Sequence, residues 1–241
     1  MLQRLRRGIQ KVDRILHREP AVTPGDFDLR KLPYLVGKDD PVILDIGCND
    51  GSHTLAFLKL FENAKVFAFE PDRRALQSFR EKVNDDRAKL YEIAISDKDD
   101  VVDFHVSDGI PPGDHADLRP GGWDLSGSIK KPKKHLAMNP WCTFDETIQV
   151  KTKRLDTWCR EEGITKIDLV WADVQGAEED LIRGGLDSLN RTHFLYTEYS
   201  DDELYEGQIN LRKIRKLLPD FKIVQRFDYD VLLENRRWTG K

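Results

Sequence analysis

Residues 42–54 read VILDIGCNDGSHT, and this stretch decides the fold that the sequence predicts. Residues 42–46 are apolar except for Asp45, which is typical of a strand buried on both faces of a sheet. A turn with two glycines follows, and residues 52–61 then have the apolar spacing of a helix. A strand that turns through glycines into a helix predicts the first unit of an α/β fold, in which ligands bind at the carboxyl ends of the strands.

The alternation of strands and helices continues along the chain. The next expected elements are a strand at 65–70, a helix at about 73–83 and a third strand at 90–95. Beyond residue 150 we expect a helix at 157–162, a strand at 167–173, a helix at 177–183, a strand at 194–198, a helix at 209–218, and strands at 221–227 and 230–233. The last two strands lie so close in sequence that they predict an antiparallel hairpin at the sheet edge. The pattern as a whole predicts an α/β fold with a mostly parallel sheet and helices on both faces.

Residues 108–150 interrupt this alternation. They are rich in glycine, proline and charge, which predicts an insertion over one end of the sheet. A chain of 241 residues with 39% hydrophobic residues is long enough to form one large core. We therefore expect an N-terminal helical extension at 1–38 and one main domain at 39–241, with the insertion at about 108–150.

The first segment predicts an amphipathic helix. Its apolar residues recur every three or four positions and are Leu2, Leu5, Ile9, Val12 and Leu16. Its other face is basic, and two interpretations stay open. The helix binds a membrane surface or a partner, or it packs on its own domain or on a second copy of the chain in a homodimer. The second is favoured because amphipathic helices most often cover a protein core.

Composition excludes several classes of protein. A net charge of -4 argues against broad nucleic-acid binding. No apolar run is long enough to span a membrane, and the N-terminus lacks the apolar centre of a secretory signal. The three cysteines, Cys48, Cys142 and Cys159, are scattered, so we expect free thiols in a reducing cytoplasm and neither a disulfide framework nor a zinc site.

The glycine turn indicates which ligand binds. A dinucleotide fingerprint has glycines where this chain has Asn49 and Ser52. The carboxylate of Asp45, before the first glycine, would repel a pyrophosphate but suits a cationic ligand. S-adenosylmethionine carries an ammonium and a sulfonium, so we expect Asp45 to help hold its methionine end. Gly47 and Gly51 would let the chain pass close to the cofactor.

Two later strand ends complete the expected cofactor site. Glu70 ends the second strand, where an acidic side chain accepts hydrogen bonds from two ribose hydroxyls, in NAD as well as in S-adenosylmethionine. Ala94 and Ile95 end the third strand, a place for an adenine-binding edge. The expected cofactor residues are Asp45, Gly47, Asn49, Gly51, Glu70, Ala94, Ile95 and Asp173.

These motifs resemble those of a known family. The carrying stretches are VILDIGCNDGSHT, FAFEPD, AISDKDD, SGSI, KRLDTW, IDLVWADVQGAEEDLIRGG and YTEYSDDELYEGQ. From about residue 42 to 233 the sequence is similar to the FkbM family of S-adenosylmethionine-dependent methyltransferases. The resemblance implies a Rossmann-like sheet of seven strands with the last antiparallel, and O-methylation of a sugar or other small-molecule hydroxyl. Asn49 replaces a glycine found in many relatives, and we expect residues 108–150 to decide the substrate.

Asp173 and Glu198 are the expected catalytic residues. They end the fourth and fifth of the strands beside the crevice where cofactor and substrate should meet. Asp173 is either a general base or a ligand of a divalent metal that lowers the pKa of the hydroxyl. The two carboxylates would suit Mg²⁺, but Tyr199 stands where other enzymes add a third ligand, so we assign no metal.

Several other side chains are candidates for substrate contacts. Glu178 either binds substrate or stabilises the first turn of its helix. His135 and Lys131 lie in the insertion, within a lysine cluster that either binds an anionic group or is solvated. The second interpretation is favoured because lysines are mostly solvated. His53, beside the glycine turn, is an alternative base.

Three other functions compete with methylation of a small molecule. An RNA or protein methyltransferase is suggested by the lysine cluster and the basic N-terminal helix, and disfavoured by the acidic net charge. An NAD-dependent oxidoreductase is disfavoured by the missing glycines. A non-catalytic binding module would retain the fold without turnover.

Overall fold

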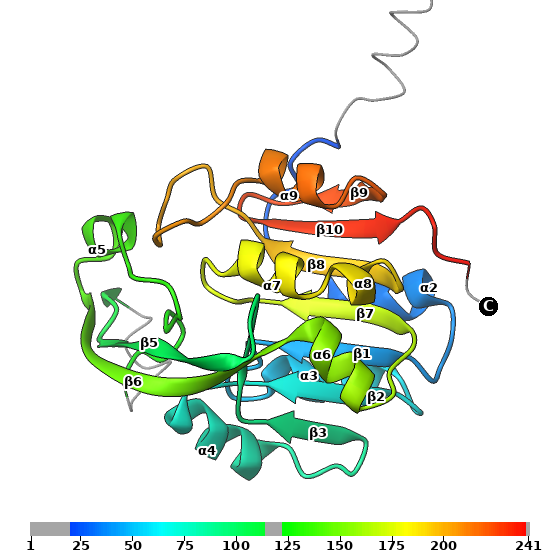
Figure 1. Ribbon diagram of the computed structural model, residues 1–241, viewed down its shortest axis with the longest axis horizontal. Coiled ribbons are helices and arrows are strands. Elements are labelled where there is room, and N and C mark those ends of the chain that lie inside the picture. The colour runs from blue at the N-terminus through cyan, green and yellow to red at the C-terminus, as the bar shows by residue number, and fades with distance from the viewer. Residues whose placement is uncertain (1–19, 114–121, 240–241) are drawn as a thin grey trace, which may run out of the picture.

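The computed structural model describes residues 20–113 and 122–239, and a seven-stranded sheet forms its centre (Figure 1). The strands follow the order β3-β2-β1-β7-β8-β10-β9. Their bounds are β1 Val42–Ile46, β2 Lys65–Phe69, β3 Ala88–Tyr91, β7 Ile167–Ala172, β8 Thr192–Glu198, β9 Phe221–Arg226 and β10 Asp230–Asn235. Strand β10 is antiparallel to both of its neighbours, and the pairs from β3 to β8 are parallel. The predicted fold class is confirmed.

One detail of the C-terminal hairpin differs from expectation. The hairpin forms, but β10 lies inside the sheet between β8 and β9, so that only β9 is at the edge. The burial of β10 explains this, because Val231, Leu232 and Leu233 are all fully buried.

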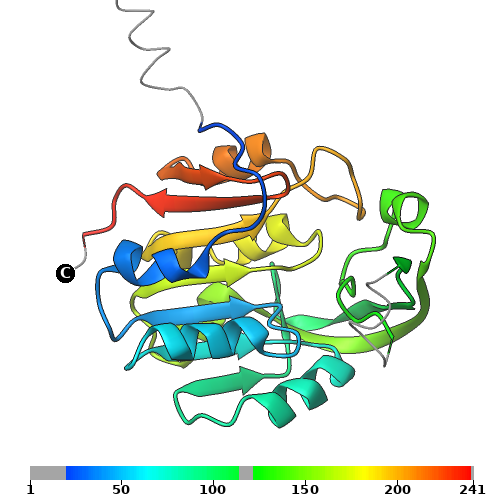
Figure 2. The ribbon, with the colours of Figure 1, turned by 180° about the vertical axis from the view of Figure 1, so that it is seen from behind.

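Helices cover both faces of the sheet. The face shown in Figure 1 carries α6 Leu155–Glu161, α7 Glu178–Gly184, α8 Leu186–Leu189 and α9 Leu211–Leu217. The opposite face, shown in Figure 2, carries α2 Leu32–Val36, α3 Ser52–Leu60 and α4 Arg73–Lys82. Each face has its own apolar core, with Trp158 in the first and Trp171 in the second. The sheet is therefore buried on both sides, as its apolar strands require.

A second, smaller sheet extends from the carboxyl ends of the main strands. It has the order β4-β6-β5, with bounds β4 Ala94–Ser96, β5 Asp100–Gly109 and β6 Cys142–Arg154, and the short helix α5 Lys134–Met138 lies between β5 and β6. The third strand expected at 90–95 is therefore wrong in its extent, because the chain leaves the main sheet after Tyr91. The described residues of the segment 108–150 include the end of β5, helix α5 and the first part of β6. The apolar core of the smaller sheet is formed by Phe104, Val106 and Val150 of β5 and β6. The sequence between these strands is rich in glycine and proline, so the alternation of apolar and polar residues that marks a strand is weak.

The expected N-terminal helix falls on residues 1–19, which lie outside the described residues. The chain that follows packs on the main sheet. Phe27, Leu32 and Val36 belong to the same core as Trp171. In the part of the chain that the structure describes, no helix is long and apolar enough to cross a membrane.

Removing the ring of Phe27 should destabilise the main domain. This ring lies 6.2 Å from Trp171, 5.9 Å from Tyr196 and 6.2 Å from Phe227, measured between ring centroids. We expect Phe27→Ala to lower the free energy of unfolding by about 3 kcal/mol, the usual cost of a buried aromatic. Urea unfolding measures it, with Tyr34→Ala as control because Tyr34 is 91% exposed. Equal stability of the two variants would show that residues before 38 are not part of this core.

Candidate active site

A pocket opens where the carboxyl ends of β1, β2 and β7 meet the smaller sheet. It encloses about 610 Å³, within the usual range for a small-molecule site. The expected cofactor residues that line it are Gly47, Asn49, Glu70, Ala94, Ile95 and Asp173. The structure thus brings together residues that are up to 126 positions apart, because Gly47, Glu70 and Asp173 each follow a strand of the main sheet and Ala94 and Ile95 begin β4 beside them.

Glu70 has a fixed orientation in this pocket. One carboxylate oxygen accepts the backbone N–H of Asn49 at 3.0 Å, and the other accepts the N–H of Asp72 at 2.8 Å. Burial raises the pKa of Glu70 to about 8, and these two hydrogen bonds oppose that rise. Each oxygen keeps a second lone pair for a hydroxyl donor. A pair of adjacent ribose hydroxyls fits this acceptor.

The rest of the pocket wall is largely apolar. Phe69 and Ile95 come from the ends of β2 and β4, and Phe104, Leu125 and Ile129 come from the smaller sheet and the segment that follows it. Such a wall suits a flat heterocycle such as adenine. Residues 124–129 of the segment expected to be an insertion therefore contribute to the pocket wall.

Asp45 and Gly51 do not line the pocket. The Asp45 side chain is buried in the sheet, where one oxygen accepts the Thr54 hydroxyl at 2.6 Å and the other has no hydrogen-bond partner. Side chains alternate along a strand, and this alternation points Asp45 toward α3. Gly51 has a φ of 79° and begins α3; a Cβ there would lie 2.5 Å from the side chain of Val83. Both residues fix the turn without reaching a ligand.

Gly47 is required by the close approach of two strand ends. Its φ is 80°, and a Cβ at this position would lie 1.8 Å from the backbone oxygen of Asp173. The N–H of Asp173 in turn donates to the oxygen of Ile46 at 2.9 Å. The glycine therefore lets the ends of β1 and β7 approach closely, which places Asp173 beside the turn after β1.

Buried carboxyls make the stability of the fold depend on pH. Burial raises the pKa of Asp45 to about 7 from 3.8, and of Glu70 to about 8 from 4.5. Between these values the folded chain holds protons that the unfolded chain has released, so the free energy of unfolding falls as pH rises from 5 to 8. Asp45→Asn should reduce this fall by at least about 1 kcal/mol. Urea unfolding at pH 5 and pH 8 measures this change in the free energy of unfolding. If the free energy falls by the same amount in Asp45→Asn as in the wild type, the raised pKa of Asp45 is contradicted.

Asp173 and Glu198 lie side by side at the ends of β7 and β8. The register pairs Trp171 with Tyr196, two residues earlier in each strand, and pairs Glu198 with Asp230 of β10. The two aromatic rings stack with centroids 3.7 Å apart. The carboxyls of Asp173, Glu198 and Asp230 therefore follow one another across β7, β8 and β10, next to the stacked rings of Trp171 and Tyr196.

Glutamine 175 joins the first two carboxyls. Its side-chain nitrogen lies 2.6 Å from Oδ1 of Asp173 and 3.3 Å from Oε2 of Glu198. Burial raises the pKa of Asp173, and burial with the charges of Asp173, Glu178 and Asp230 raises the pKa of Glu198. A carboxylate with a raised pKa is a stronger proton acceptor than an exposed one.

Glu178 has a local role in the described structure. Its side chain is fully buried, does not line the pocket, and accepts the N–H of Gly176 at 3.0 Å. Burial raises its pKa to about 7. The residue supports the turn between β7 and α7 through this hydrogen bond.

The histidine candidates also lie outside the pocket wall. His135 is buried against the rings of Phe144 and Tyr205, at 5.3 and 5.4 Å. His53 lies in the first turn of α3, with its ring 4.9 Å from that of Trp171. Neither histidine is placed to act on a ligand of the pocket described here.

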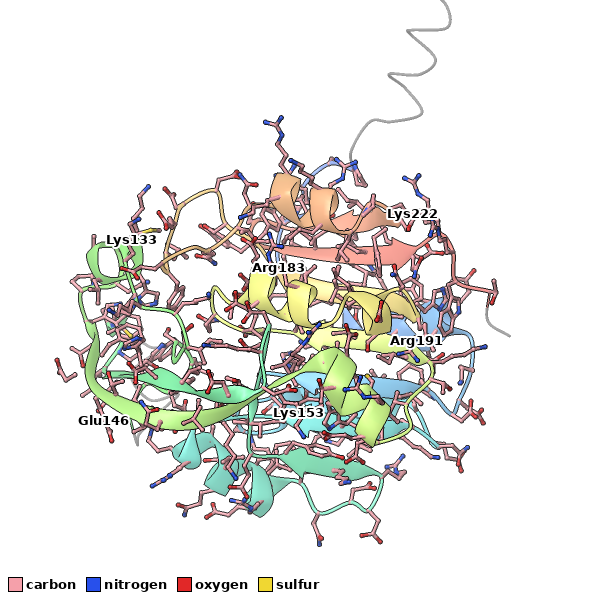
Figure 3. All side chains as sticks on the ribbon, in the orientation of Figure 1. Lys133, Glu146, Lys153, Arg183, Arg191 and Lys222 are labelled. Carbon is pink, nitrogen blue, oxygen red and sulfur yellow. The ribbon has the colours of Figure 1, made fainter. Side chains whose placement is uncertain are left out.

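The lysine cluster joins the α5 region to neighbouring acidic residues. Lys130 pairs with Asp180 at 2.6 Å, Lys134 with Asp202 at 2.6 Å, and Lys133 with Glu203. Lys131 is exposed, and its backbone oxygen accepts the N–H of Glu206 at 2.8 Å. Figure 3 shows Lys133 at the start of α5, across from the loop between β8 and α9. These contacts favour a structural role over recognition of an anionic substrate.

Sequence analysis missed two residues of the site. Gln175 lines the pocket, and the Tyr205 hydroxyl lies 3.0 Å from its side-chain oxygen and 2.8 Å from the backbone oxygen of Ser126. Both lie in the stretches that carry the family resemblance, but neither residue type announces a chemical role. Among the described residues, no three His, Cys, Asp or Glu side chains are arranged to hold a metal ion.

Comparison with known proteins agrees with this geometry. The chain is 52% identical over 213 residues to the 2-O-methyltransferase NoeI of Sinorhizobium fredii, covering 86% of this chain and 85% of that protein. It is 25% identical over 201 residues to the hexuronic acid methyltransferase AglP of Haloferax volcanii, covering 83% and 70%. A solved methyltransferase FkbM from Methylobacillus flagellatus shares the fold, with a TM-score of 0.51 at 13% identity. That match covers 86% of this chain but only 48% of the other.

A family described as the methyltransferase FkbM domain matches residues 45–231. This span contains the glycine turn, Glu70, Asp173 and Glu198. Since the match takes in most of the chain and all of the pocket wall, the chain belongs to the methyltransferase FkbM domain family.

Proposed function

We propose that this protein transfers a methyl group from S-adenosylmethionine to a hydroxyl oxygen of a sugar. Membership in a methyltransferase family sets aside the NAD-dependent oxidoreductase considered above. Transfer to oxygen is supported by the relative named as a 2-O-methyltransferase, and a sugar acceptor by the relative named for hexuronic acid. The observation that carries the proposal is a half-buried carboxyl with a raised pKa, Asp173, in the wall of the pocket.

The described residues fit the cofactor. Glu70 would accept the ribose hydroxyls, and the apolar wall with Ile95 would hold the adenine. S-adenosylmethionine supplies a methyl group on a positively charged sulfur. The carboxyl of Asp173 in the pocket wall would face that positive charge.

The acceptor hydroxyl would lie against Asp173. In the transfer, the hydroxyl oxygen would form a bond to the methyl carbon while the bond from that carbon to sulfur breaks and S-adenosylhomocysteine leaves, and the Asp173 carboxylate would take the hydroxyl proton. A sugar hydroxyl becomes acidic only as the bond forms, so the carboxylate acts in the transition state. Its raised pKa improves the match. Glu198 lies beside Asp173 and shares the side-chain amide of Gln175 with it.

We also propose that the protein works in the cytoplasm. Cys48, Cys142 and Cys159 are all buried free thiols, as expected in a reducing compartment. We propose in addition that the helix expected at the N-terminus joins two copies of the chain in a homodimer. Residues 1–19, which would form this helix, lie outside the described structure.

A labelled-methyl transfer screen tests the proposed function. Sugars, nucleotide-sugars and lipid-linked glycans are incubated with labelled S-adenosylmethionine, with Mg²⁺ and with a chelator. RNA and unrelated protein serve as competing acceptors. We expect label on a sugar; label on RNA or protein alone would support the alternative methyltransferase, and no binding of S-adenosylmethionine would reject the proposal.

A further inference from the structure

Gln175 has a backbone conformation that glutamine rarely adopts. Its φ is 47°, in the left-handed region, and the next residue, Gly176, has a φ of 92°. A non-glycine residue keeps such a conformation where its surroundings fix it, and such residues are frequent at functional sites.

The Gln175 side chain is held at both ends. Its nitrogen lies between Oδ1 of Asp173 and Oε2 of Glu198, at 2.6 and 3.3 Å. Its oxygen lies 3.0 Å from the hydroxyl of Tyr205. With the amide in this orientation its two N–H groups face the two carboxyls, whereas the reverse orientation would place an acceptor against two acceptors.

The backbone of Gln175 and its supporting residues are fixed as well. Its backbone oxygen accepts the hydroxyl of Ser128 at 2.7 Å. Tyr205 is 1% exposed and packs on Gly176, where a Cβ would lie 2.6 Å from the tyrosine Cβ. Two segments that are distant in sequence therefore hold Gln175, one through Ser128 and the other through Tyr205.

The side-chain amide of Gln175 lies among acidic groups that oppose ionisation of Asp173 and Glu198. Besides each other, Asp173 and Glu198 are faced by Asp45 from β1, Glu178 from α7, Asp230 from β10 and the Tyr205 hydroxyl. Burial raises the pKa of Asp173, and hydrogen bonds from Gln175 oppose that rise. No cation contributes to this balance for Asp173 or Glu198 in the described part of the chain.

We propose that Gln175 is a positioning residue that holds Asp173 and Glu198 side by side and keeps Asp173 oriented as the proton acceptor. This inference rests on the proposed function, because it takes Asp173 as the group that receives the hydroxyl proton. Gln175 acts through the carboxyls and need not touch the sugar.

Gln175→Met tests this role, since methionine is similar in length and cannot donate. We expect kcat to fall about 10- to 100-fold, the usual effect of misplacing a general base. The KM for the acceptor and the Kd for S-adenosylmethionine should stay within about threefold, a margin below 1 kcal/mol. The acid limb of the kcat profile should move to higher pH, because Asp173 loses a donor to its charged form. Gln77→Met, at an exposed glutamine of α4, is the matched control and should match the wild type.

A wild-type kcat and acid limb in Gln175→Met would overturn the inference. If the wild type methylates no sugar, the proposed function fails, and the inference is tested separately by ¹³C NMR titration of the carboxyl carbons. The Asp173 resonance should then titrate at higher pH in Gln175→Met, and identical titration would overturn the role. If circular dichroism shows that this variant does not fold, Tyr205→Phe replaces it. We expect a smaller shift in the same direction, and an unmoved acid limb would count against the proposal.

Discussion

Asp173→Asn is expected to lower kcat by roughly 10²- to 10⁴-fold, the range for loss of a general base. Asparagine has nearly the same size and still accepts a hydrogen bond from Gln175, but it cannot take a proton near neutral pH. The Kd for S-adenosylmethionine should stay within about threefold, which calorimetry measures. In the wild type, the rate should fall as pH drops below the raised pKa of Asp173, because the carboxyl then holds a proton. This acid limb should disappear in the variant.

The control for this prediction is Asp201→Asn, at an exposed aspartate. It should keep the wild-type kcat and pH profile. If Asp173→Asn retains kcat within about tenfold of the wild type, a group other than Asp173 accepts the hydroxyl proton. Glu198→Gln is the next variant to measure, because Glu198 faces the same amide.

Glu70→Ala is expected to raise the Kd for S-adenosylmethionine by roughly 100-fold, since two hydrogen bonds are lost and each contributes about 1–1.5 kcal/mol. The variant loses the acceptor of both ribose hydroxyls. Isothermal titration calorimetry measures the change. At saturating cofactor, kcat should change much less, because the proposed proton acceptor is Asp173 and not Glu70.

Glu92→Ala is the matched control for Glu70→Ala, because Glu92 is an exposed glutamate that pairs with Arg80. Glu70 also accepts the N–H groups of Asn49 and Asp72, so circular dichroism and urea unfolding must show that the variant is folded. A folded Glu70→Ala protein with a Kd within about threefold of the wild type would contradict the assignment of the ribose site.

The main sheet could be predicted because buried parallel strands leave continuous apolar runs in the sequence. Strands β1, β7 and β8 are of this kind, and the short connections between strands and helices limit their order. The smaller sheet could not be predicted in the same way. Its strand β5 buries alternate residues on one face only, and its connection to β6 reads as an irregular loop.

Positions in the site were predictable to the extent that strand ends determine them. Glu70 and Asp173 each follow a parallel strand directly, so their place at the carboxyl edge follows from the fold. Asp45 is inside its strand, where alternation decides the direction of the side chain and turns it toward Thr54. Gln175 and Tyr205 meet only through tertiary packing, which no spacing in the sequence reveals.

Analysis of the methylated product tests the central claim most directly. The protein is given S-adenosylmethionine with a ¹³C-labelled methyl group and the acceptor found in the transfer screen, together with RNA and peptide competitors. Two-dimensional NMR then identifies the atom that carries the label. We predict a methyl ether on a sugar hydroxyl oxygen, formed by the wild type and lost in Asp173→Asn. A label on nitrogen, on carbon or on the RNA or peptide, or the same ether formed at the wild-type rate by Asp173→Asn, would contradict the account.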